Sequence, residues 1–210
     1  MRIITITEAL NELKLYDARI RKAISNTKLA GAAKKSSARI GAITKNEFNE
    51  RAKASYQSVT DLIANRNTLK SAIVKSNAVT EITVNGKVMT VAEAIERKNA
   101  ICYEEELLNE MKLQYASATG TVNKENQKVD KKVDELISTL VGKDTDKKLC
   151  KEDQEAVEKP YREKNEYELV DPVGLFNEIS KLEADIDGFK NQVDTQLVIA
   201  NSTSTIEIDF

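Results

Sequence analysis

Residues 80–98 read Thr-Glu-Ile-Thr-Val-Asn-Gly-Lys-Val-Met-Thr-Val-Ala-Glu-Ala-Ile-Glu-Arg-Lys, and this stretch decides the fold. The short β-like runs on either side of Asn85-Gly86 predict a hairpin, because this dipeptide accepts the two positive φ angles of a type I′ turn. Thr90 and Glu93 then form a capping-box pattern, in which each side chain satisfies a backbone N–H of the other residue. An apolar series at helical spacing follows. The stretch therefore predicts a tight hairpin that leads directly into a long helix.

The composition favours long helices over a thick globular core. The 210 residues include only two prolines, seven glycines and no tryptophan, and 5% of the residues are aromatic. Proline and glycine are the residues that long helices tolerate least. Because so few aromatic side chains are available to fill a core, we expect thin seams between paired helices.

The longest apolar pattern lies before the hairpin. Between residues 48 and 73 the spacing alternates between four and three over almost four heptads, which is typical of a coiled-coil seam. Tyr56 and Ile63 widen this apolar stripe in the sequence. Arg66 falls at a seam position, where it either sets the register of the helices or marks a place where the seam is shallow.

Two further patterns predict helices after the hairpin and near the end of the chain. In the first, a residue recurs every seven positions: Ala94, Ile101, Leu108 and Tyr115. The pattern resumes after a break predicted at Gly120, with Asn126 as a register-setting seam residue. Asp171, followed by a proline, predicts the start of a last helix whose heptads cover 175–197. The seam residues on which we expect packing and assembly to depend are Leu62, Leu108 and Leu182.

The beginning of the chain repeats the stretch that follows the hairpin. Residues 4–10 align with residues 89–95, including a second capping box formed by Thr5 and Glu8. Either both segments reuse a good helix start, or two equivalent helix starts pack side by side. β-like segments also occur near both ends of the chain, and we expect them to form one small sheet with the hairpin that caps the helices.

The candidate chemical groups all have structural interpretations. Residues 104–106 are three consecutive glutamates, which point in different directions on a helix and therefore predict a solvated face. Asp144 and Asp146 lack the remaining ligands and the glycine of a calcium loop. Cys102 and Cys150 form neither a metal motif nor a disulfide framework, so we expect free thiols, with Cys102 packed as a small hydrophobe.

The chain contains no histidine, which removes Ser-His-Asp and Cys-His catalysis and the usual proton shuttle at neutral pH. We therefore expect no enzymatic activity, no cofactor and no metal site. The first residues lack the apolar run of a signal peptide, and no window approaches the roughly 18 apolar residues that span a bilayer. These observations predict a soluble protein made in the cytoplasm.

The predicted fold class is mainly α. We expect one elongated domain over residues 1–210, an antiparallel helical bundle or coiled coil of about five helices, with a small β-hairpin or sheet at one end. Within it, residues 28–45 form a basic loop without an acidic residue, 81–90 form the hairpin, and 143–168 form a charged, solvated insertion.

Three segments together resemble known proteins. They are the helix Thr-Glu-Ala-Leu-Asn-Glu-Leu-Lys-Leu-Tyr-Asp-Ala-Arg-Ile at 7–20, the hairpin Val-Asn-Gly-Lys at 84–87 with the helix start at 90–98, and the ending at 171–209. The first two segments resemble the septicolysin-like family of bacterial helical proteins. All three resemble a group of proteins encoded by tailed phages and prophages of Gram-positive bacteria. These resemblances involve caps, a hairpin and seams, so they imply no catalytic residues.

The resemblance to phage-encoded proteins implies a non-enzymatic structural component of a virion, located in the neck, in the tail or baseplate, or on the capsid. Such a subunit is made in the host cytoplasm and associates with itself, in a ring, and with other virion proteins. The septicolysin resemblance implies a membrane-acting cytolysin as an alternative. A nucleic-acid-binding accessory protein that uses the 28–45 loop is a third hypothesis, although no aromatic residues interleave in that loop to stack on bases. We expect neither a membrane nor nucleic acid as a partner.

Overall fold

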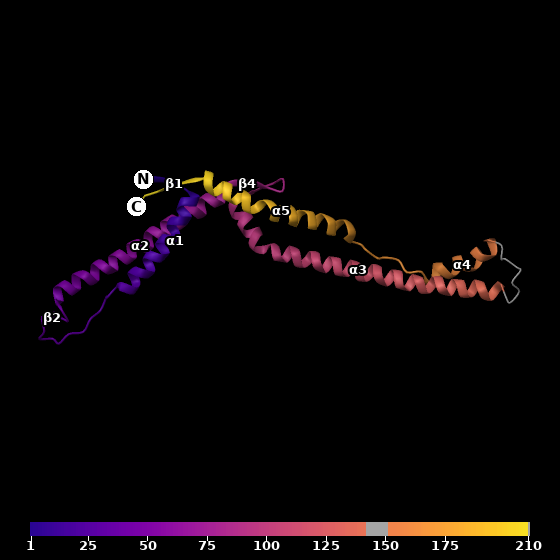
Figure 1. Cartoon of the computed structure of the whole chain (residues 1–210), viewed down its shortest axis with the longest axis horizontal. Coiled ribbons are helices and arrows are strands. Elements are labelled where there is room, and N and C mark those ends of the chain that lie inside the picture. Colours follow the sequence, from indigo (N-terminus) through magenta and orange to yellow (C-terminus); the bar gives the residue numbers. More distant parts are fainter. Residues whose placement is uncertain (142–150, 210) are drawn as a thin grey trace. The chain divides into compact units, whose positions relative to one another are not determined.

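The structure of the chain is a computed structural model that describes residues 1–141 and 151–209. Its secondary structure is mainly helical, as the sequence predicts (Figure 1). Where the sequence predicts one domain over 1–210, the contacts within the chain divide it into two compact units. Unit 1 comprises residues 1–99 and 188–210, and unit 2 comprises residues 100–187.

The described residues form five helices and three pairs of antiparallel strands, which confirms the predicted fold class. The helices are α1 (Ile6–Asn26), α2 (Lys45–Val79), α3 (Val91–Val141), α4 (Lys151–Asn165) and α5 (Leu175–Thr203). The strands are β1 (Arg2–Thr5), β2 (Arg39–Ile40), β3 (Ile43–Thr44), β4 (Glu81–Val84), β5 (Lys87–Thr90) and β6 (Thr205–Ile208).

The prediction of one joint sheet is wrong. β4 pairs with β5 and β2 with β3, whereas β1 near the beginning of the chain pairs with β6 near its end. Ile206 and Ile208 of β6 join Leu69 and Ile73 of α2 in one buried cluster. Packing on a helix, and not a third strand, therefore covers the apolar face of the terminal pair.

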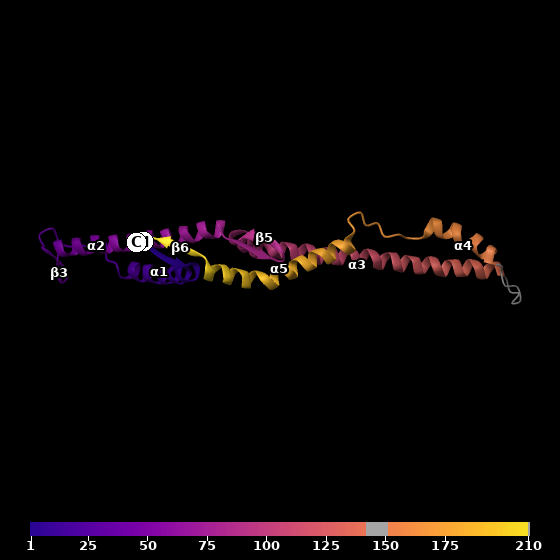
Figure 2. The same cartoon turned by 90° about the horizontal axis from the view of Figure 1, so that it is seen from above.

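α1 and α2 lie side by side in unit 1 (Figure 1 and Figure 2). The seam predicted over residues 48–73 is confirmed, and its last two positions, Leu69 and Ile73, are buried. The charged side chain of Arg66 at a seam position has a partner on α1: its Nε donates a hydrogen bond to the carboxylate of Asp17 at 2.9 Å. The expected widening of the seam is wrong, because Tyr56 and Ile63 are exposed on the flank of α2.

The basic loop has more structure than its sequence pattern suggests. β2 and β3 form a two-residue ladder within it, and Thr44 caps the first turn of α2 by accepting from the backbone N–H of Glu47 at 3.1 Å. The ammonium of Lys45 donates to the backbone carbonyls of Lys34 and Lys35, at 3.1 and 3.3 Å. These contacts order the loop around its own backbone.

In unit 2, α3 continues through Gly120, where the sequence predicts a break. One glycine costs a helix only about 1 kcal/mol relative to alanine, a cost that a helix of 51 residues can absorb. Asn126 lies at the predicted seam position, but its partner is an extended segment and not a helix. Its side-chain amide donates to the carbonyl of Tyr167 and accepts from the N–H of the same residue, at 2.9 and 2.8 Å.

The last helix begins later than its sequence signal. The carboxylate of Asp171 accepts from the backbone N–H groups of Gly174 and Leu175, at 2.8 and 2.6 Å, so α5 starts at Leu175. Gly174 takes a φ of 74°, which turns the chain between the cap and the helix. Pro172 therefore precedes the helix instead of occupying its first turn.

The charged insertion contributes α4, and Arg162 of this helix forms an ion pair with Asp130 of α3 at 2.8 Å. Positions 143–150 of the insertion lie outside the described residues, and they include Asp144, Asp146 and Cys150. Among the described residues, no helix contains an apolar stretch of the length needed to span a membrane.

Candidate assembly site

The hairpin at Asn85-Gly86 has the predicted turn. Asn85 and Gly86 both take positive φ angles, 51° and 73°, as a type I′ turn requires. The turn also contacts α5 within unit 1, because the backbone N–H of Asn85 donates to Oε1 of Gln192 at 2.9 Å. The hairpin is thus attached to the C-terminal helix of the same unit.

Gly188 of α5 gives the hairpin room for this contact. A Cβ added to Gly188 would lie 2.4 Å from Cγ and Oδ1 of Asn85, well inside van der Waals contact. In the sequence, Gly188 is only a residue of low helix propensity inside a predicted helix. Its physical reason is the close approach of Asn85, which lies more than 100 positions earlier in the chain.

We predict a strong energetic coupling between Gly188 and Asn85. Gly188→Ala alone should lower the free energy of unfolding, because overpacking costs about 1–3 kcal/mol and outweighs the gain of about 1 kcal/mol in helix propensity. In an Asn85→Gly background, which keeps the positive φ, the same change should be stabilising. Urea unfolding of the four chains in the cycle measures the coupling. Equal effects of Gly188→Ala in both backgrounds would show that the two residues do not touch.

Both predicted capping boxes are present. Around Thr90 and Glu93, the Thr90 N–H donates to the Glu93 carboxylate at 2.7 Å, and the Glu93 N–H donates to the Thr90 hydroxyl at 3.2 Å. Thr5 and Glu8 repeat this arrangement at 2.8 and 3.2 Å. In each box the pKa of the glutamate is lowered, first by the backbone N–H of the threonine and then by its hydroxyl. The boxes therefore favour the charged carboxylate at each helix start.

The repeat seen in the sequence extends over a whole corner of the structure. We call residues 76–94 the hairpin corner, and residues 200–208 with residues 2–9 the terminal corner. In the hairpin corner, the N–H of Val91 donates to the carbonyl of Thr80 at 2.9 Å. In the terminal corner, the N–H of Ile6 donates to the carbonyl of Ser204 at 3.0 Å. Each helix start is thus attached in the same way to the helix–strand junction of its corner, although in the terminal corner this junction lies at the other end of the chain.

Four buried positions of the hairpin corner have buried counterparts in the terminal corner, which also buries Ile4 and Ala200. Ile82 and Val84 of β4 match Ile206 and Ile208 of β6 in register and in burial. The corresponding pairs in the helices that follow are Val91 with Ile6 and Ala94 with Ala9, and all four residues are buried. An alignment of residues 76–84 with residues 200–208 contains this signal, which extends the repeat beyond the two helix starts.

The two corners also carry corresponding hollows. One hollow, of about 640 Å³, lies between the start of β4 and α5 and includes Ile82 and Ala200 in its lining. The other, of about 660 Å³, lies between the start of β6 and α2 and includes Ile206 and Ser76. Among residues 1–141 and 151–209, no group of three Cys, Asp or Glu side chains is arranged to hold a metal ion.

The three predicted seam leucines are placed on their helices as expected, with different burial. Leu108 of α3 is buried, whereas Leu62 of α2 and Leu182 of α5 are half-buried. Within unit 2, an ion pair between Lys112 and Glu183, at 2.6 Å, joins α3 and α5 one turn from Leu108 and next to Leu182 in the sequence. The role of the three leucines in assembly stays a prediction.

The sequence missed one contact at the centre of unit 1. Phe189 of α5 is 1% exposed, and the guanidinium carbon of Arg97 on α3 lies 4.4 Å from its ring centroid. At this distance the cation is attracted to the electron-rich face of the ring. Phe189 lies within the heptads predicted over 175–197, but Arg97 is a charged residue that no heptad pattern marks as a core contact.

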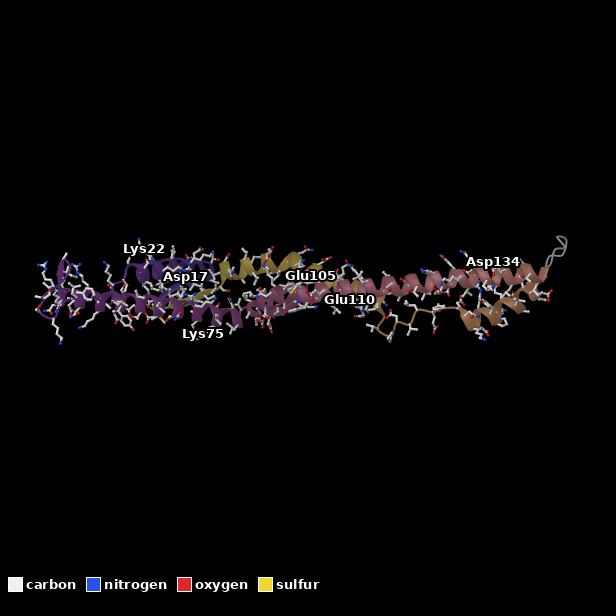
Figure 3. The ribbon with its side chains drawn as sticks, turned by 90° about the horizontal axis from the view of Figure 1, so that it is seen from below. Asp17, Lys22, Lys75, Glu105, Glu110 and Asp134 are labelled. Carbon is white, nitrogen blue, oxygen red and sulfur yellow. The ribbon has the colours of Figure 1, made fainter. Side chains whose placement is uncertain are left out.

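A groove lies between the C-terminal end of α1 and α2, in a part of the chain that is rich in basic residues. Its volume is about 420 Å³. We call it the basic groove, and its lining residues are Ile24, Thr27, Leu29, Tyr56, Val59, Thr60 and Ile63. Ile24, Leu29 and Tyr56 are each more than half exposed. Lys22, which Figure 3 labels on α1, is one of the basic residues in this part of the chain.

The outer face of α3 in unit 2 combines apolar and acidic side chains. We call it the acidic face, and its residues are Tyr103, Glu106, Leu107, Glu110 and Leu113. All five are exposed, with Tyr103 at 72%. Figure 3 labels Glu110 within this face and Glu105 beside it.

Two predictions about this part of α3 need correction. Glu104 and Glu105 are half-buried, on the side of the helix that carries Leu108, so only Glu106 of the three glutamates belongs to a fully solvated face. The expectation that Cys102 packs as a small hydrophobe is wrong, because Cys102 is an exposed free thiol. The helical phase explains both results, since the buried stripe follows Ile101, Leu108 and Tyr115.

Comparison of the chain with protein-family models, with curated proteins and with solved structures finds no match.

Proposed function

We propose that the chain is a non-enzymatic structural subunit of a bacteriophage virion and that it acts through helix–helix assembly with copies of itself and with other virion proteins. The tail or baseplate, the neck and the capsid surface are the places in the particle that suit such a subunit. The chain would be made in the cytoplasm of the bacterial host and would then be incorporated into the particle, in a ring of identical subunits.

The observation that carries this proposal is the sparse burial in unit 2. Among its described residues, four apolar side chains are buried: Leu108, Val129, Val133 and Ile186. Several large apolar side chains of the same unit are instead more than half exposed, among them Tyr103, Leu107, Leu113 and Phe176. Clusters of exposed apolar side chains on helices are typical of surfaces that bind other proteins. A subunit that completes its burial with neighbours accounts for this distribution.

Mass spectrometry of phage particles purified from a culture that carries the gene tests the proposal. We expect the chain in the particles, at a copy number that is a multiple of the order of a rotational symmetry. Light scattering of the isolated chain should give a mass that rises with concentration. Particles without the chain, together with a monomer at every concentration, would overturn the proposed function.

A further inference from the structure

We propose that the basic groove receives the acidic face of α3 from a second copy of the chain, so that copies associate head to tail. This inference rests on the proposed function, because it names the partner that a self-assembling subunit would bind. The two surfaces come from different parts of the chain, one from unit 1 and the other from unit 2, and they complement each other in charge and in apolar anchors.

The groove lies within a basic segment of the chain, although its own lining residues are uncharged and Asp61 directly follows Thr60 of the lining. Residues 18–60 contain ten lysines or arginines and only two acidic residues, so this segment has a net charge of +8. The two acidic residues, Glu47 and Glu50, are already paired with Arg51 and Lys53. Since the whole chain has a net charge of −2, all other residues together carry −10. The chain thus separates its charge into a basic segment and an acidic remainder.

The acidic face has the pattern of a helix that docks in a groove. Tyr103, Leu107 and Leu113 follow each other at intervals of about one and two turns, and Glu106 and Glu110 lie between them on the same side. Buried Leu108 belongs to the opposite side of the helix, so docking would leave the seam of unit 2 intact. Helices that bind in grooves use anchors at such intervals.

The groove offers the matching apolar surface. Ile24 and Tyr56 stand on its two sides, from α1 and α2, and both are more than half exposed. Lys28 precedes Leu29 of the lining. Lys53 lies one turn before Tyr56, on the same flank of α2, and its exposed pair with Glu50 is long, at 3.7 Å, so a docked carboxylate can compete for it. An apolar helix face with two carboxylates therefore finds both its anchors and its counter-charges at the groove.

A second copy fits this groove better than nucleic acid or an anionic membrane. A phosphate backbone gains nothing from an apolar lining, and Tyr56 is the single aromatic residue among the lining residues for a base to stack on. Because the groove and the acidic face are different patches, the contact is heterologous and closes into a ring or continues as a filament.

Paired charge reversals test the inference. Glu106→Lys with Glu110→Lys places lysines opposite the basic groove, and Lys28→Glu with Lys53→Glu places glutamates opposite the acidic face. Each double variant alone should lose self-association by about tenfold or more, measured by light scattering. A 1:1 mixture of the two should regain it, because each then meets a complementary partner. Raising NaCl from about 0.05 to about 0.5 M should weaken the wild-type assembly.

Disulfide trapping checks the position of the contact. In a background with Cys102→Ser and Cys150→Ser, a tagged copy with Tyr56→Cys should cross-link to an untagged copy with Leu107→Cys. Val74→Cys is the matched control, because Val74 is also exposed on α2 and lies outside the groove. A cross-link at both positions, or at neither, would overturn the inference.

Other outcomes also decide the question. A wild-type chain that remains monomeric, or a mixture that does not recover association, would overturn the inference. A variant that misfolds would also lose self-association, so circular dichroism of each double variant accompanies the scattering measurement. If these two changes abolish binding to duplex DNA or to phosphatidylserine vesicles without changing self-association, the groove serves that anionic partner instead.

The two proposals fail in different ways. If purified particles contain the chain, and if both charge variants are incorporated as well as the wild type, the head-to-tail contact is wrong and the structural function stands. Recovery of association in the mixture, with no chain in particles, would overturn the virion function and leave the contact in place.

Discussion

Replacing Phe189 with alanine should lower the free energy of unfolding by about 3–5 kcal/mol, the usual cost of emptying a buried phenylalanine site. Phe189 is among the largest fully buried side chains of the described residues, and the change would also remove the ring beneath the Arg97 guanidinium. Chemical unfolding followed by circular dichroism measures the loss.

Phe176→Ala is the matched control for Phe189→Ala. Both phenylalanines lie on α5, but Phe176 is 65% exposed and its ring makes one aromatic contact, with Tyr115 at 6.2 Å between centroids. Such a contact is worth about 0.5–1.5 kcal/mol, so we expect a loss of that size at most. If the two substitutions cost the same, the assignment of Phe189 to the core of unit 1 is wrong.

Val84→Asp and Ile208→Asp should each prevent unit 1 from folding, at a cost above about 4 kcal/mol. Both side chains are buried at corresponding positions of the hairpin and terminal corners. A carboxylate at either position would lose its hydration without gaining a partner, which is among the most destabilising of single changes. Loss of the helical signal at 25 °C, or a collapse of the thermal transition, is the measurement.

Val88→Asp and Ile3→Asp provide the controls, because these residues occupy corresponding positions on the outer sides of the same strand pairs. They are 66% and 65% exposed, so a charge there stays hydrated and should change stability by less than about 1 kcal/mol. If Ile208→Asp were tolerated while Val84→Asp was not, the terminal corner would contribute little to the fold, and its correspondence with the hairpin corner would have no energetic meaning.

Local patterns account for the features that the sequence predicted correctly. The turn at Asn85-Gly86 follows from two residues that accept positive φ, and the boxes at Thr5 and Thr90 follow from a threonine three positions before a glutamate. The seam on α2 follows from heptad spacing. Each of these features depends on residues within one or two turns of each other, so neighbouring side chains and backbone dihedrals determine it.

The errors of helix placement have a local cause as well. A glycine at position 120 and the pair Asp171-Pro172 are ordinary helix boundaries, but a boundary signal is weak against the packing of the flanking residues. Tyr56 and Ile63 extend the apolar pattern of α2, yet α1 covers too narrow a stripe to bury them. The exposure of these two side chains is therefore determined by how α1 packs against α2.

The sequence by itself determined the hairpin, the capped helix starts, the seams and the separation of charge between residues 18–60 and the rest. Only the tertiary structure decided that β1 pairs with β6, that Gly188 makes room for Asn85, that Arg66 meets Asp17 and that Asn126 holds the backbone of Tyr167. The members of these pairs lie 41 or more positions apart in the chain. Each contact forms only when packing has brought two elements together, and no pattern along one segment records its partner.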